Sequence, residues 1–158
     1  MVHVSCDEKF AVVSEGVIAN SERIKANLAT NGRHFFFSEA AAEVFGHLVE
    51  EAFRATRSVE EAFAHALSQT EGDFAVAVIS TCESPRIFCA HKNRPLLIGT
   101  EDQATVVSSC SNAFRFESNP YPIGAGEYAI LSDSGFTVGS ISRHDKGNLA
   151  PTSLLLVQ

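Results

Sequence analysis

The sequence predicts an α+β fold in which mainly antiparallel strands are covered by helices. In the first half of the chain, apolar residues recur every three to four positions, which is typical of amphipathic helices. From Phe74 onward, short apolar runs alternate with turn residues, which is typical of strands. Because these strands follow one another through short turns, we expect them to pair in an antiparallel sheet.

The opening segment is predicted to contain one buried strand and one helix. Residues 10–13 form a short apolar run, and Gly16 marks a turn that ends the strand. Asn20 or Ser21 can begin the helix, because both side chains accept hydrogen bonds from free backbone N–H groups. Residues 31–32, Asn-Gly, would end it.

Two stronger helices are expected before the strand-rich half. Residues 35–37 are predicted as a short strand, and Ser38 as the cap of the helix that follows. Ser58 and Glu61 form a capping box at the start of a third helix, which ends at residues 71–72. The second helix has a broad apolar face made of Val44, Phe45, Leu48, Val49, Ala52 and Phe53.

The second half is predicted to consist of strands joined by turns. Asp-Ser-Gly at residues 133–135 is a hairpin signal between the last two of them. The tail at 151–158 is apolar and is interpreted either as a last strand or as a partner-binding end. The predicted strands cover residues 74–79, 86–90, 96–99, 104–107, 126–131 and 136–139.

Length and charge narrow the function classes. The chain has 158 residues, which suits one domain with its own core. Its net charge is −7, without a basic run, which argues against binding to nucleic acid or to anionic lipid. The longest apolar runs are too short for a membrane span, and the first residues do not resemble a signal peptide. We therefore expect a cytoplasmic protein with reduced thiols.

Local motifs predict no metal, cofactor or nucleotide site. The six histidines show neither H-x-x-x-H nor H-E-x-x-H spacing, and the four cysteines show no C-x-x-C spacing. No Walker loop, G-x-G-x-x-G or G-x-S-x-G is present. Cys110 is interpreted as an inert, partly buried thiol, with a reactive thiol as the alternative. Cys82 and Cys89 are expected to pack as small apolar residues.

The order of the residues resembles one known family. Residues 10–20, F-A-V-V-S-E-G-V-I-A-N, resemble the A-V-V-H-N-G-I-I-E-N segment of class II glutamine amidotransferase domains, in the form found in glucosamine-6-phosphate synthases. The likeness covers about residues 3–138, so that 1–158 is expected to form a single domain with an unassigned tail at 139–158. It continues in order at residues 38–44, 47–48, 71–79, 95–99 and 126–131.

This resemblance implies the N-terminal-nucleophile hydrolase fold, a four-layer αββα sandwich. It also implies glutamine as an ammonia donor, with no metal or cofactor. Family members open with a cysteine whose thiolate attacks the glutamine amide, and nothing at the start of this chain matches that opening. The sandwich is therefore expected to be incomplete at its N-terminal part. Cys6 is not a replacement, because it falls just before the matched strand at 10–13.

Three positions correspond to residues of the family's glutamine cleft. Glu15 stands where the family has the asparagine that helps to form the oxyanion hole, and a carboxylate cannot donate a hydrogen bond. Ala41 stands where the family has the aspartate that holds the α-ammonium group of glutamine. Gly16 is retained, and its N–H can still donate, although a turn that requires glycine is the preferred explanation of this residue.

These changes predict a domain without glutaminase activity that acts as a binding or interaction module, or is a remnant. The incomplete sandwich would expose an apolar sheet face, so we expect a homodimer or larger assembly that covers it. Two alternatives remain. The first is one half of a split amidotransferase whose separate subunit supplies the nucleophile. The second is a small-molecule sensor that reuses the glutamine cleft.

Overall fold

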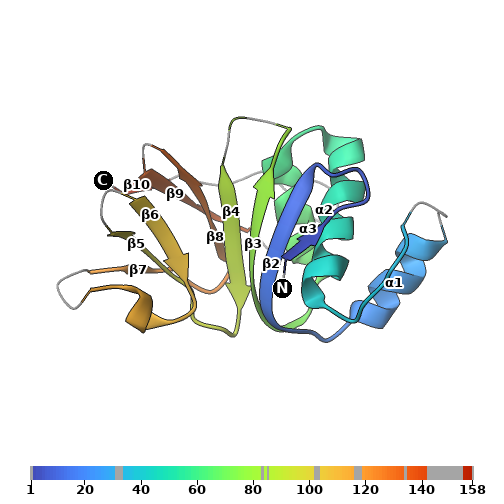
Figure 1. Ribbon diagram of the computed structural model, residues 1–158, viewed down its shortest axis with the longest axis horizontal. Coiled ribbons are helices and arrows are strands. Elements are labelled where there is room, and N and C mark those ends of the chain that lie inside the picture. Colours follow the sequence, from blue (N-terminus) through green and yellow to red (C-terminus); the bar gives the residue numbers. More distant parts are fainter. Residues whose placement is uncertain are drawn as a thin grey trace.

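The structure is a computed structural model that describes residues 2–30, 34–82, 84, 86–101, 104–115, 119–133, 135–141 and 155–157. Its helices are α1 (Ser21–Ala29), α2 (Ala41–Thr56) and α3 (Val59–Gln69), with a 3₁₀ turn at Ser111–Ala113 (Figure 1). Its strands are β1 (Val2–Val4), β2 (Phe10–Ile18), β3 (Gly72–Ser80), β4 (Ile87–Lys92), β5 (Leu97–Glu101), β6 (Ala104–Ser108), β7 (Tyr121–Pro122), β8 (Glu127–Ser132), β9 (Gly135–Ser140) and β10 (Leu155–Val157).

The strands form two antiparallel sheets. The larger sheet has seven strands in the order β1-β2-β3-β4-β8-β9-β10, and the smaller has three in the order β6-β5-β7. Each paired neighbour in both sheets runs antiparallel, as the sequence predicts. The predicted hairpin is confirmed, since β8 pairs with β9 from Glu127–Ser140 to Ser132–Gly135. The tail contributes a last strand, because Leu155–Val157 pairs with β9.

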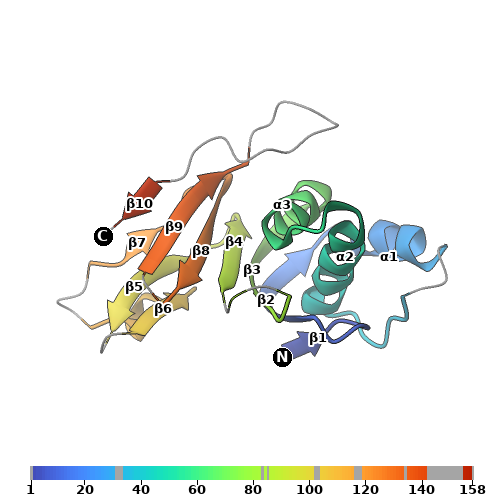
Figure 2. The ribbon, with the colours of Figure 1, turned by 90° about the horizontal axis from the view of Figure 1, so that it is seen from above.

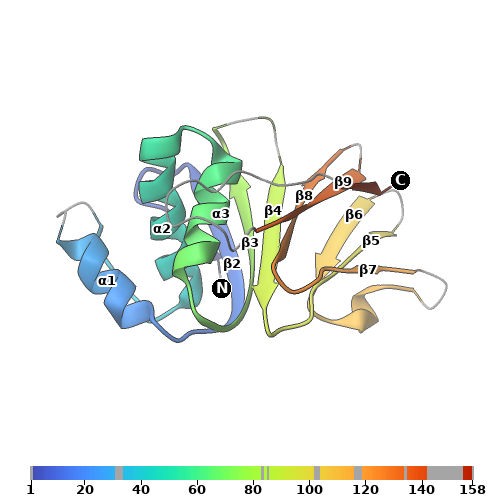
Figure 3. The same ribbon diagram turned by 180° about the vertical axis from the view of Figure 1, so that it is seen from behind.

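The elements are stacked in three layers around two cores. Helices α2 and α3 cover one face of the large sheet (Figure 3), while β5, β6 and β7 lie beside β8 and β9, away from the helices (Figure 2). One core fills the space between the helices and the large sheet, and the other lies between the two sheets. On β4, Phe88 and Ala90 belong to the helical core, whereas Cys89 belongs to the core between the sheets.

Helix α2 has the amphipathic face that its sequence predicts. Five of the six predicted apolar positions are buried, and Phe53 packs against the same core as a partly buried residue. The helix ends where Arg57 adopts a left-handed conformation and donates its N–H to the Phe53 carbonyl over 2.9 Å. The Ser58 hydroxyl then accepts the Glu61 N–H at 3.3 Å, which confirms the predicted cap of α3.

Three predictions of local structure are wrong. Strand β2 does not end at Gly16 but continues to Ile18, because it pairs with β3 along its whole length. Residues 35–37 form no strand, and Ser38 is not the cap of α2, which begins at Ala41. The predicted start of α1 is confirmed, because the helix begins at Ser21 with Asn20 at its N-cap position, but the Asn20 side chain bonds to the backbone of Gln69 and Glu71 and caps no N–H of the helix. The predicted end at 31–32 lies outside the described residues.

The carboxylate of Glu43 is the physical reason for the difference at residues 35–38. It accepts hydrogen bonds from the backbone N–H of Phe37 at 2.7 Å and from the N–H of Ser38 at 2.8 Å. The Ser38 hydroxyl also donates to it, at 2.6 Å. Backbone donors that a strand partner would use are therefore bound by the first turn of α2.

Part of the large sheet is bare on the face opposite the helices. Val2 pairs with Val13, and Ala11 pairs with Ile79, so these side chains share that face. The small sheet covers the same face further along, over Ala75 and Ala77 of β3 and over β4, β8 and β9. We call the bare region the open face of β1–β3; its large exposed residues are Val2, Val4, Val13, Val17 and Ile79. Among the described helices, none is long and apolar enough to cross a membrane.

Candidate functional site

Glu15 projects from the open face of β1–β3. Side chains alternate along β2, so that Val12 and Ile18 are buried towards the helices while Val13 and Val17 are exposed. Glu15 lies between the two exposed valines, and its side chain is 53% exposed. The carboxylate is therefore accessible from solvent on the side of the sheet that faces away from α2.

Two residues from distant parts of the chain contact this carboxylate. The Arg94 guanidinium, just after β4, lies 3.4 Å from Oε1 of Glu15. The Ser109 hydroxyl, just after β6, donates to Oε2. Glu15 therefore sits where the large sheet meets the small one. Sequence reasoning did not find Arg94 or Ser109, because neither lies near Glu15 in the chain and no motif links them.

Gly16 is required by a close contact between strands. Its φ is +91°, and an added Cβ would lie 2.1 Å from the carbonyl oxygen of Asp73 on β3. A side chain at this position would clash with backbone that has no room to move. Gly16 thus has a structural reason to be glycine, within a strand and not at a turn, whatever its N–H binds.

Ala41 lies in a different environment from the other two positions. It is the first residue of α2, is 9% exposed, and belongs to the core between the helices and the large sheet. Its methyl group offers no charge or hydrogen bond. Figure 1 shows that the C-terminal end of β2 and the start of α2 lie at the same end of the large sheet. Glu15 and Ala41 nevertheless belong to opposite faces of that sheet.

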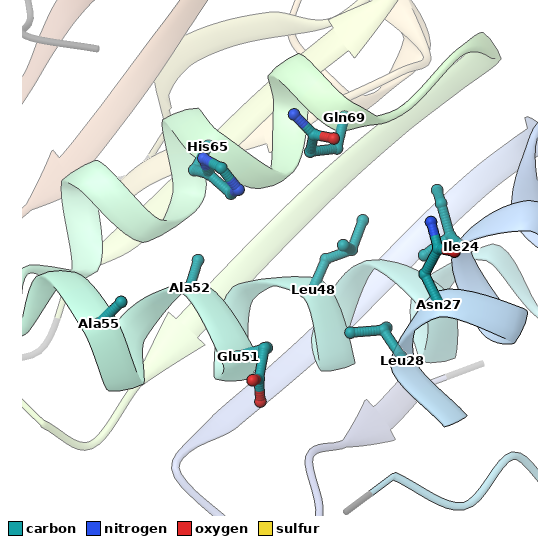
Figure 4. Close-up of a pocket in the computed structure, with 9 residues that line it drawn as sticks. All are labelled: Ile24, Asn27, Leu28, Leu48, Glu51, Ala52, Ala55, His65 and Gln69. Carbon is teal, nitrogen blue, oxygen red and sulfur yellow. The ribbon is translucent and has the colours of Figure 1, made fainter. Parts of the chain in front are cut away.

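A groove of about 350 Å³ lies between the three helices (Figure 4). Its lining is mainly apolar on α1 and α2, and it also includes the polar side chains of Asn27, Glu51, His65 and Gln69. None of the three positions predicted from the family cleft lines it. The residues around it are Ile24, Asn27, Leu28, Leu48, Glu51, Ala52, Ala55, His65 and Gln69.

A second group of polar side chains gathers at the other side of α2. Cys6, His34, His47 and Glu50 each offer one atom able to bind a metal, and these atoms lie within 4.8 Å of one another. Sequence reasoning did not find this cluster, because its members come from three separate segments. The only local signal is the spacing of His47 and Glu50, three positions apart on one helix face.

Comparison with known proteins identifies a family for most of the chain. Residues 1–115 match the model of a family described as a glutamine amidotransferase domain. The glutamine--fructose-6-phosphate aminotransferase (isomerizing) of Pyrococcus horikoshii is 34% identical over 140 residues, which are 88% of this chain and 23% of that protein. The corresponding enzyme of Listeria innocua is 30% identical over 154 residues, covering 97% of this chain and 25% of that protein. This chain spans about a quarter of the length of these relatives.

Solved structures share the fold. The glutamine phosphoribosylpyrophosphate amidotransferase of B. subtilis matches 91% of this chain and 32% of its own, with a TM-score of 0.77 and 23% identity. A glutamine aminotransferase class-II domain protein from Silicibacter pomeroyi matches 90% of this chain and 72% of its own, with a TM-score of 0.62 and 14% identity. These structures confirm the predicted fold class, and the family model and the curated relatives confirm the family resemblance.

Proposed function

Because this chain belongs to the glutamine amidotransferase domain family, we propose that it is a member that does not hydrolyse glutamine and serves as a binding domain. The observation that carries this proposal is the carboxylate of Glu15. In the family resemblance, this position supplies an amide that donates a hydrogen bond to the oxyanion. Here the side chain accepts hydrogen bonds from Ser109 and pairs with Arg94.

The chemistry of Glu15 opposes the reaction. When glutamine is attacked, negative charge develops on its amide oxygen and must be stabilised by donors. An ionised carboxylate has no proton to donate and repels that charge. Removing one such donor costs about 3–4 kcal/mol in comparable enzymes, even before any repulsion is added.

The alanine at position 41 also opposes the reaction, because it weakens binding of the substrate. Its buried methyl group cannot pair with the α-ammonium group of glutamine, which the family resemblance assigns to an aspartate at this position. Both changes lie inside the part of the chain that matches the family, so they apply whatever precedes residue 1.

The direct test is ammonia release from glutamine by the purified chain. We expect no release above background, and no difference between the native chain and a Cys6→Ala variant. Release that is clearly above background and lost in Cys6→Ala would contradict the proposal, because it would identify Cys6 as a nucleophile.

The split amidotransferase is the second candidate. Under this alternative, a separate polypeptide that binds this chain would restore ammonia release. If the complex releases ammonia, Glu15→Gln should change the rate, since the side chain would then lie in a working site.

We further propose that this chain binds a second copy of itself. Strand β1 is the edge of the large sheet, and its only paired neighbour among the described strands is β2. The exposed valines and Ile79 of the open face lie next to this edge. Two copies can pack their open faces against each other across a two-fold axis, so the same surface can serve both partners.

A further inference from the structure

The cluster at one side of α2 brings four potential metal-binding atoms close together. Nδ1 of His47 lies 3.2 Å from Nδ1 of His34, 3.5 Å from Oε2 of Glu50 and 3.8 Å from Sγ of Cys6. Nδ1 of His34 lies 3.8 Å from the same Glu50 oxygen. We propose that Cys6, His34, His47 and Glu50 bind one zinc ion.

These distances match the edges of a zinc tetrahedron. Zinc binds nitrogen at about 2.0–2.1 Å and sulfur at about 2.3 Å, so its ligand nitrogens lie about 3.3 Å apart and a nitrogen–sulfur pair about 3.6 Å apart. Four of the six separations among these atoms are 3.2–3.8 Å, close to these values, and all six are within 4.8 Å. An ion at the centre therefore needs only small shifts of the side chains.

Neighbouring groups hold two of the ligands in the required orientation. Nε2 of His34 lies 3.2 Å from a carboxylate oxygen of Glu51, which fixes the proton on Nε2 and leaves the Nδ1 lone pair facing the cluster. Arg54 donates to Oε1 of Glu50 at 2.6 Å, and the backbone N–H of Cys6 donates to Oε2 at 3.0 Å. Such outer contacts are typical of zinc sites, whose ligands are rarely held by the metal alone.

Charge and burial also suit a divalent ion. Side chains of His34, His47 and Glu50 are almost fully buried, whereas Cys6 is exposed and leaves a route from solvent. A thiolate and a carboxylate together neutralise Zn²⁺, which offsets the cost of burying the ion. Mixed sulfur, nitrogen and oxygen ligands in a tetrahedron favour zinc over Mg²⁺ or Ca²⁺.

A rival group shares His47 but is less suited to a metal. His3, Glu43 and His47 also offer atoms within 4.8 Å of one another. The carboxylate of Glu43, however, already accepts three hydrogen bonds from Phe37 and Ser38. The group has three members, so it would leave a tetrahedral ion one protein ligand short.

A site closed by four protein ligands is structural in kind. It would connect the β1–β2 loop, the segment before α2 and α2 itself, and it would clamp the edge of the large sheet onto the helical layer. This inference does not rest on the proposed loss of glutaminase activity.

Cobalt titration of the chelator-treated chain tests the site directly. Co²⁺ can take the place of zinc, and its visible absorption bands depend on the coordination geometry. We expect the visible bands of tetrahedral cobalt, a thiolate-to-cobalt charge-transfer band, and loss of both when one equivalent of zinc is added. Cys6→Ser should abolish the charge-transfer band, and His34→Gln the tetrahedral spectrum. The controls Cys110→Ser and His65→Gln should leave both unchanged, since both residues are exposed and lie outside the cluster.

Two further measurements separate metal binding from damage to the fold. Zinc should raise the midpoint of thermal unfolding and protect Cys6, but not Cys110, from alkylation. Glu51→Gln should weaken zinc binding by about 10–100-fold without loss of folding, as expected for a residue that positions a ligand. Absence of the cobalt bands in the folded native chain would overturn the proposal. Equal zinc affinity in the native chain, Cys6→Ser and His34→Gln would overturn it as well.

Discussion

At the scale of single residues, Gly16 carries the sharpest steric constraint next to the candidate site. A Cβ at this position would lie 2.1 Å from the Asp73 carbonyl oxygen, in a backbone conformation with φ of +91°. We expect Gly16→Ala to lower the free energy of unfolding by about 2–4 kcal/mol, because strain and a backbone clash add together. Urea unfolding measures this loss.

Gly126 is the matched control for this substitution. Its φ is +81°, but an added Cβ would meet nothing within 4 Å. Gly126→Ala should therefore cost only the backbone strain, about 1 kcal/mol. Equal losses in the two variants would mean that the contact with β3 does not explain the glycine at position 16.

Side-chain contacts between residues that are far apart in the chain were not predictable from the sequence. Glu15 was identified as a site position by resemblance, but its contacts with Arg94 and Ser109 depend on how the two sheets meet. The same holds for Cys6 and His34, which approach α2 from loops. Local spacing carries no information about such pairs, because they are fixed by strand order and layer packing.

At the scale of elements, the start of α2 depends on the carboxylate of Glu43. Burial raises the pKa of Glu43, but hydrogen bonds from the Ser38 hydroxyl and from the N–H groups of Phe37 and Ser38 outweigh it and hold the pKa below its ordinary value of 4.5. The charged form is thus favoured in the folded state. Its contribution to stability is complete above pH 4.5 and is lost as the pH falls through the lowered folded-state pKa.

Glu43→Gln should therefore destabilise the protein at neutral pH by about 2–3 kcal/mol, because an amide cannot accept all three hydrogen bonds. The difference from the native chain should shrink in acid, where the native carboxylate is protonated as well. Urea unfolding across the acid range measures both effects. Glu22→Gln is the control: this side chain is 79% exposed, and its loss should change stability by less than about 0.5 kcal/mol. A loss in Glu43→Gln that does not vary with pH would contradict this account.

Elements with long apolar periodicity were predicted well, and short aromatic runs were not. The faces of α2 and α3 follow from residues spaced three and four apart, since each helix must bury one side. Phe35 and Phe37 have high strand propensity, yet both are exposed and belong to no strand. Propensity was overridden there because the neighbouring N–H groups bind Glu43.

At the scale of the whole molecule, the open face of β1–β3 predicts self-association. We expect a dimer at micromolar concentration, measured by light scattering coupled to size exclusion. Val13→Lys, at the centre of that face, should produce a monomer, because a charge would be buried between the two copies. The side chain is 44% exposed, so the fold should tolerate the change.

Phe37→Lys provides the comparison for this experiment. Phe37 is 88% exposed but lies in the segment before α2, away from the open face. This variant should remain dimeric. A native chain that is monomeric, or a Phe37→Lys variant that dissociates as readily as Val13→Lys, would count against pairing through the open face.

The general architecture was predictable, but the arrangement of the layers was not. Turn residues between the strands of the second half indicated an antiparallel sheet, and the sheet is antiparallel. The separation of β5, β6 and β7 into a second sheet left no local signal, since β5 and β6 have the same kind of apolar run as β4 and β8, and β7 consists of two residues, Tyr121–Pro122. Only the order in which strands pair decides which side chains meet.

The pairing of β2 with β3 also has a consequence for how the chain folds. These strands pair from Phe10–Ser80 to Ile18–Gly72, and all three described helices lie in the segment between them. Closing so long a segment has a large entropic cost, which falls if the segment is already compact. The contacts between α2 and α3 are local, so this helical pair is expected to form first and to bring the two strand ends together. Formation of the central sheet would then be the slow step. Its rate would depend on helices that take no part in the hydrogen bonds of the sheet.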